Sequence, residues 1–205
     1  MSTPSDHLDR ILERLTREWL NGSVHYDFWR RLNSLAKDEP DLVAVAPEFF
    51  ESTSYAHIDA AVVRLNRLFD TSKGAVSVYE LIKYAHKHPE AFREGSPAEV
   101  SDAVREAEKA ISESKDLLDR FRRQRNGYFA HIAGEYFHTG RSVTDEHPVR
   151  YSDVIEVLNL VGRVVNIFLA PHEDSELLPE VIGVDYAFEG LRDCLRRGVD
   201  SDDDS

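Results

Sequence analysis

Two residues six positions apart, Arg125 and His131, have side chains suited to acid–base chemistry at an anionic group. Arg125 continues the seven-residue apolar series Val104, Ile111 and Leu118, so it stands where a predicted helix asks for an apolar side chain. An arginine in such a place is costly unless it meets an anion or a charged partner. Histidine is the side chain whose unperturbed pKa lies near neutrality, so His131 can exchange protons there.

The arginine belongs to a cluster of Arg120, Arg122, Arg123 and Arg125, in a chain whose net charge is −13. Such an acidic balance argues against broad, nonspecific nucleic-acid binding, so any contact with a nucleic acid is expected to be local to this cluster. The alternative is a solvated helix face whose arginines pair with Asp116 or Asp119.

The spacing of Arg125 and His131 limits how they can meet. On a straight helix, six residues rise by about 9 Å and leave the two side chains roughly 120° apart. Gly127 lies between them and permits a local bend, because glycine weakens a helix by about 1 kcal/mol relative to alanine. Either another element completes the site, or a second copy of the same helix does.

Two stretches carry a resemblance to a known family. R-N-G-Y-F-A-H, from Arg125 to His131, resembles the R-x(4–6)-H motif of HEPN domains, with a polar residue directly after the arginine. The stretch 48–81 is similar to the region upstream of the motif in HEPN proteins of the abortive-infection type, where a long helix ends in L-F-D and a serine opens the next helix. One departure is Ala133, where such proteins often carry an acidic residue.

The resemblance implies an all-α, HEPN-like helical bundle with extra N- and C-terminal helices. It implies a metal-independent RNA endonuclease of the toxin or abortive-infection (antiphage defence) type, with a composite active site in a homodimer and no cofactor. His131 would act as general base or acid at the ribose 2′-hydroxyl or the leaving oxygen, and Arg125 would hold the scissile phosphate. Asn126 would orient the phosphate or the histidine. An antitoxin protein is a further candidate partner.

The neighbouring residues have candidate roles in RNA binding. Arg120, Arg122 and Arg123 would contact flanking phosphates, and Tyr128 would stack on a base. Core packing is the alternative role for Tyr128.

Two other interpretations of the chain remain open. One is a non-catalytic HEPN-like module that binds RNA, a nucleotide or a protein partner, for which the departure at Ala133 leaves room. The other is a helical scaffold whose basic cluster meets an acidic surface.

Apolar periodicity and end signals predict helices, and no stretch alternates long enough for a convincing strand. The predicted ranges are 6–20, 26–37, 47–69, 77–88, 97–136 with a bend, 153–169 and 185–197. Ser96-Pro97-Ala98-Glu99 combines a capping box with a proline at the first helical position. The prediction is one domain over 1–199, followed by a disordered acidic tail over 200–205.

Composition favours the cytoplasm. Cys194 is the single cysteine, so a disulfide framework is not expected. The first residues lack the pattern of a signal peptide. The most apolar segment, 157–170, is expected to be too short and too polar to span a membrane.

The composite site predicts a two-fold dimer with the motif helices near its axis. Light scattering at micromolar concentration should therefore give about twice the chain mass of 23.4 kDa. A monomer throughout the concentration range would contradict the composite site.

Overall fold

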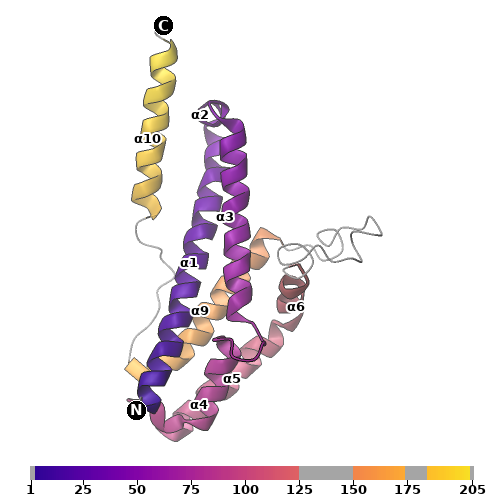
Figure 1. The fold of residues 1–205 in the computed structure, drawn as a ribbon, viewed down its shortest axis with the longest axis vertical. Helices are drawn as coiled ribbons and strands as arrows, with labels where there is room; N and C mark the ends of the chain where they lie inside the picture. The colour runs from indigo at the N-terminus through magenta and orange to yellow at the C-terminus, as the bar shows by residue number, and fades with distance from the viewer. Residues whose placement is uncertain (1–2, 125–149, 174–183, 204–205) are drawn as a thin grey trace, which may run out of the picture. The chain divides into compact units, whose positions relative to one another are not determined.

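The computed structural model describes residues 3–124, 150–173 and 184–203, and within these ranges it is helical and contains no strand (Figure 1). The prediction of an all-α fold is thereby confirmed. Contacts group the chain into two compact units, Met1–Leu20 with Val62–Pro179, and Asn21–Ala61 with Glu180–Ser205. Helices α1 (Pro4–Asp38) and α3 (Pro47–Leu68) contribute residues to both units.

The first unit is organised around a long apolar helix, α9 (Tyr151–Glu173). α9 contacts α5 (Pro97–Glu113), α4 (Val78–Lys87) and α6 (Lys115–Gln124), as Figure 1 shows. A short 3₁₀ turn, η1 (Pro89–Ala91), links α4 towards α5. The buried side chains of α9 are Val154, Val157, Leu158, Leu160, Val161, Val164, Val165, Phe168 and Leu169.

α9 is longer than the predicted range of 153–169, and most of its apolar side chains are buried. Its apolar part is long enough to cross a membrane by length and composition alone, but half of that stretch is buried inside the structure. A core helix has the same composition. Trp19 fixes α1 against α9, because its indole Nε1 donates a 2.8 Å hydrogen bond to the Leu158 carbonyl.

The second unit contains the rest of α1 and α3, the short helix α2 (Pro40–Ala44) between them, and α10 (Val184–Asp203). α1 and α3 lie side by side here, with α2 at their turn (Figure 1). Glu39 ties α10 to this turn, accepting from Arg192 at 2.5 Å and from Arg196 at 2.7 Å. The core of the unit consists of Leu32, Leu35, Leu42, Phe50 and Phe188.

Several predicted helix ends were wrong. α1 runs through Asn21 and Gly22, where the sequence predicted a break. An interior glycine costs about 1 kcal/mol, and burial of flanking side chains such as Trp19 and Trp29 outweighs that cost. α10 likewise continues through Gly198, its predicted end, to Asp203. The predicted loop at 38–47 contains α2.

The starts of α5 and α4 differ in how they are capped. At α5 the box is formed: Ser96 Oγ accepts from the Glu99 amide at 3.3 Å, and Glu99 Oε2 accepts from the Ser96 amide at 2.7 Å. At α4, Ser77 occupies the N-cap position without a side-chain cap. The helix begun at Ser96 ends at Glu113, and α6 starts at Lys115. The chain therefore bends at Ser114, before Gly127, which lies outside the described residues.

A close approach at Gly95 joins the start of α5 to the end of α9. The amides of Gly95 and Glu94 donate to the Pro171 carbonyl at 2.8 and 3.1 Å. A Cβ on residue 95 would lie 2.6 Å from the Pro171 Cβ, which is inside van der Waals contact. Only glycine fits this position without a shift of the backbone.

We expect Gly95→Ala to destabilise the protein by about 1–3 kcal/mol, the usual cost of overpacking, because the proline ring cannot rotate away. The melting temperature should fall by several degrees in a chain of this size. Gly190→Ala is the matched control, since nothing lies within 4 Å of its added Cβ and alanine is the better helix former. If both variants melted at the wild-type temperature, the contact with Pro171 would be wrong.

Candidate functional site

Helix α6 carries Arg120, Arg122 and Arg123, the described members of the basic cluster. Its buried face consists of Leu117, Leu118 and Phe121, which pack it towards α9. Arg122 and Arg123 are exposed next to this face. The predicted site residues Arg125, Asn126, Tyr128 and His131 lie outside the described residues.

The three described arginines of the cluster differ in their partners. Arg120 lies 3.4 Å from the buried carboxylate of Asp153, which also accepts from the Arg150 amide at 2.9 Å. Arg122 donates to Asp119 at 2.9 Å, an ion pair that the sequence offered as the alternative to phosphate contact. Arg123 makes no ion pair or hydrogen bond among the described residues. Of the three, Arg123 is the most available to a ligand.

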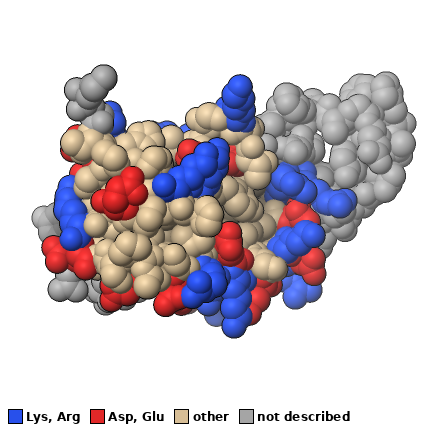
Figure 2. Space-filling view, turned by 90° about the horizontal axis from the view of Figure 1, so that it is seen from below, with Lys and Arg blue, Asp and Glu red and all other residues tan. Residues whose placement is uncertain are grey.

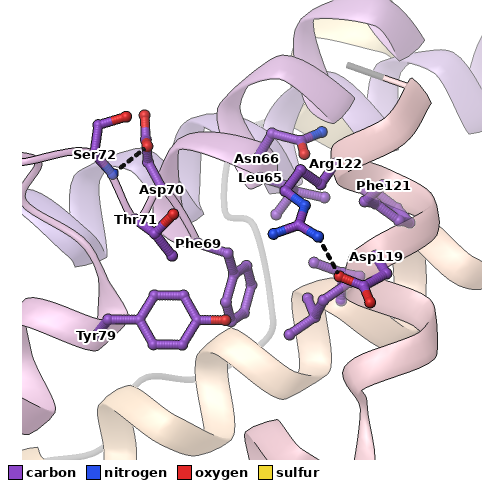
Figure 3. A pocket seen from close by; sticks show the side chains of 12 residues that line it. Leu65, Asn66, Phe69, Asp70, Thr71, Ser72, Tyr79, Asp119, Phe121 and Arg122 are labelled. Carbon is purple, nitrogen blue, oxygen red and sulfur yellow. Dashed lines mark hydrogen bonds and ion pairs between the residues drawn. The ribbon is translucent and has the colours of Figure 1, made fainter. Parts of the chain in front are cut away.

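A pocket of about 210 Å³ opens beside α6, where the end of α3 and the loop after it approach (Figure 3). Its walls combine aromatic rings with hydrogen-bonding side chains. The lining residues are Leu65, Asn66, Phe69, Asp70, Thr71, Ser72, Tyr79, Leu118, Asp119, Phe121, Arg122 and Val157.

Tyr79 and Arg122 reach this pocket from opposite sides, as Figure 3 shows. Burial raises the pKa of the Tyr79 phenol; the Arg122 guanidinium opposes this rise and the Asp119 carboxylate adds to it. The phenol is therefore protonated at neutral pH and available as a donor. The Phe69 ring lies edge-on to Tyr79, with their centroids 6.3 Å apart.

The end of α3 and its loop supply the polar wall. Asn66 is only 7% exposed and lines the pocket while its Nδ2 donates to the Val62 carbonyl at 2.9 Å. Asp70 accepts from the Ser72 amide at 2.8 Å, which closes the turn after α3. The amide and carboxylate can bind the N–H groups of a base or the hydroxyls of a ribose, while Arg122 suits a phosphate.

The pocket joins one of the two stretches that carry the HEPN resemblance, 48–81, to the basic cluster that leads into the other stretch in the sequence. Phe69, Asp70 and Ser72 come from the L-F-D segment and the residues after it, and Arg122 comes from the basic cluster. Asn66 and Tyr79 were not predicted as site residues. The L-F-D segment could have pointed to these residues. Its similarity to HEPN proteins was interpreted only as the end of a helix, and not as part of a binding site.

On the face drawn in Figure 2, basic and acidic side chains are interspersed among neutral ones. Within the described residues, no group of three or more His, Cys, Asp or Glu side chains is placed to hold a metal ion. The histidines His57 and His25 face each other, with their Nδ1 atoms 3.0 Å apart.

The ion pairs predict that removing the side chain of Arg120 or that of Arg123 lowers the free energy of unfolding by different amounts. Arg120→Ala would leave the buried Asp153 without its cation, and we expect a loss of about 1 kcal/mol, limited because Arg120 is partly exposed to water. Arg123→Ala, the matched control, should change stability by less than about 0.5 kcal/mol. Urea unfolding measures both; equal stabilities would show that the Arg120–Asp153 pair contributes nothing.

Comparison with known proteins supplies the family. No curated protein and no solved structure matches the chain. A family model described as AbiU2, of the HEPN type, matches residues 5–167, which include both resembling stretches and the pocket. This match covers well over half of the 205 residues. The chain therefore belongs to the AbiU2 family of abortive-infection HEPN domains.

Proposed function

We propose that this HEPN domain is a ribonuclease that cleaves RNA without a metal ion, in the cytoplasm, as the toxin of an abortive-infection defence. The observation that carries the proposal is the pocket beside α6, which gathers aromatic, amide, carboxylate and guanidinium groups next to the basic cluster. These are the groups that bind a single unstacked nucleotide. Arg122 in its wall is three residues before Arg125 in the sequence.

The proposed reaction is transfer of the RNA phosphoryl group to its own 2′-oxygen. His131 takes the proton of the 2′-hydroxyl, the oxygen attacks phosphorus, and the bond from phosphorus to the 5′-oxygen breaks. The leaving 5′-oxygen receives a proton from a second imidazole. The products are a 2′,3′-cyclic phosphate and a 5′-hydroxyl, so atoms and charge balance without an added reactant.

Arg125 would stabilise the negative charge that builds up on the phosphoryl oxygens, and Asn126 would orient the phosphate or His131. In this scheme proton transfer belongs to histidine and charge stabilisation to arginine, so a metal ion has no step to perform. Because the side chains of Arg125 and His131 would lie roughly 120° apart on a straight helix, a second copy of the chain would supply the other imidazole, as in a homodimer. An antitoxin protein is the proposed regulator.

The described residues of the site have side chains suited to binding the nucleotides that flank the scissile bond. A base would pack against Tyr79 and Phe69, its polar edge would face Asn66, and Arg122 would meet the adjoining phosphate. Arg123, which is exposed, would contact the next phosphate. Tyr128 would stack on a neighbouring base, and Arg120 would contribute less because it pairs with Asp153.

The second candidate function is binding without cleavage. Ala133 stands where HEPN proteins of this type often have an acidic residue, and the pocket provides the same nucleotide-binding groups in either case. The two functions differ in whether His131 transfers a proton.

The test is cleavage of single-stranded RNA by purified protein in the presence of EDTA. We expect wild-type activity to survive chelation, and His131→Ala to lower the cleavage rate by about 10²-fold or more while RNA affinity hardly changes. Arg125→Ala should weaken both affinity and turnover, because its phosphate contact acts before and during the reaction.

Thermal melting and light scattering of the same samples serve as controls for fold and assembly. A folded His131→Ala protein with wild-type cleavage would remove His131 from the site. Activity that appears only after Mg²⁺ or Mn²⁺ is added would contradict the metal-free mechanism. RNA binding without any cleavage by the wild-type protein would select the second candidate function.

A further inference from the structure

One buried carboxylate in the first unit is shared by three arginines. The Glu18 side chain on α1 is 8% exposed, and its Oε1 lies 2.9 Å from Arg14 on the same helix. Its Oε2 lies 3.2 Å from Arg64 and 4.0 Å from Arg67, both near the end of α3. We call these three residues, Arg14, Arg64 and Arg67, the arginine triad.

Because the Glu18 carboxylate is buried, it needs cationic partners. A carboxylate removed from water must be paired, and losing its cations would leave an uncompensated charge. Glu18 therefore fixes the guanidiniums of two helices at one place. A single carboxylate cannot neutralise three guanidiniums, so the group has an excess of two positive charges.

The triad also keeps most of its hydrogen-bonding capacity. A guanidinium has five N–H donors, and Glu18 offers only two oxygens to all three side chains. The Arg14 and Arg67 side chains are 50% and 57% exposed, and that of Arg64 is 30% exposed. Two other exposed arginines of this unit are each paired with a single carboxylate, Arg105 with Asp102 and Arg122 with Asp119.

This local excess stands out in a chain of net charge −13. An acidic protein repels a polyanion at long range, so binding needs places where oriented cations outnumber anions. Guanidiniums from two helices, held by a common carboxylate, are pre-organised for such contacts and lose little freedom on binding.

The position of the triad relates it to the pocket beside α6. Arg64 and Arg67 flank Leu65 and Asn66 in the sequence, and those two residues line the pocket. On a helix, residues 64 and 67 share one face, while residue 66 points elsewhere. The last turns of α3 therefore present Arg64 and Arg67, two members of the triad, on one face and the pocket wall on another.

We propose that the arginine triad is a second binding surface for the RNA backbone, which holds phosphates of the strand whose nucleotide enters the pocket. The proposal rests on the proposed function for its ligand, and it concerns binding rather than cleavage. Three separate guanidiniums suit successive phosphodiesters of a flexible single strand better than one small anion.

The experiment measures binding of a single-stranded RNA oligonucleotide to the His131→Ala protein over a range of salt concentrations. Each phosphate contact on a single strand contributes roughly 0.7 to the slope of log affinity against log salt. Replacing the triad by glutamine, together with Glu18→Gln to avoid a buried unpaired charge, should lower that slope by about 2. Arg67→Gln alone should lower it by about 0.7.

Arg67→Gln keeps the test valid if the fourfold variant does not fold, because Arg67 is the most exposed member and the farthest from Glu18. Arg105→Gln, which removes the same charge from an exposed position on α5, is the matched control and should leave the slope unchanged. Equal slopes for Arg67→Gln and Arg105→Gln, or no RNA binding by the parent protein, would overturn the proposal.

Cleavage is scored separately, so the two proposals fail in different ways. If the triad variants bind RNA more weakly and the wild-type protein does not cleave RNA, the proposed RNA-binding surface is retained and the proposed ribonuclease activity is rejected. If the wild-type protein cleaves RNA and the triad variants leave the slope of log affinity against log salt unchanged, the proposed ribonuclease activity is retained and the proposed RNA-binding surface is rejected.

Discussion

Burial of the apolar face of α9 is the interaction on which the first unit depends. α9 contacts α4, α5 and α6, and Trp19 of α1 hydrogen-bonds to its backbone. Each of these helices has one apolar face, and such a face is stable only when another element covers it. The pocket is a consequence of this packing, since Val157 of α9 lines it together with Leu118 and Phe121 of α6. The site is thus built on rigid helices, although its polar groups come from the ends of helices and a loop.

The sequence predicted the features that depend on neighbouring residues and missed those that depend on distant ones. The capping box of Ser96 and Glu99 is satisfied within four residues, so the start of α5 was predictable. Gly22 was a misleading signal, because the local preference against glycine in a helix is about 1 kcal/mol and tertiary burial exceeds it. The helix at Pro40 was missed for the same reason, since local propensity is a weak term beside packing such as the burial of Leu42.

In the candidate site too, the sequence indicated what depends on neighbouring residues and missed what depends on distant ones. Arg125 and His131 were predicted as site residues from residue type, spacing and the family resemblance, and they stay a prediction because they lie outside the described residues. The pocket was not predictable, because Asn66, Tyr79 and Arg122 are brought together only by the approach of three separate segments. Glu18 and Arg14 have the spacing of an ordinary surface ion pair on one helix. They differ from such a pair only because Arg64 and Arg67 of α3 also contact Glu18.

The end of α3 connects these observations. Within four residues, 64–67, it provides two members of the arginine triad and two residues of the pocket wall. The turn at Asp70 and Ser72 then fixes the direction in which the chain leaves the helix towards Tyr79. A shift of α3 along its axis would move the charged surface and the pocket together, because both are attached to the same two turns. The proposed phosphate contacts and the proposed nucleotide pocket are therefore held in a constant relation by one helix, which an acidic protein needs if it is to select a strand rather than attract any polyanion.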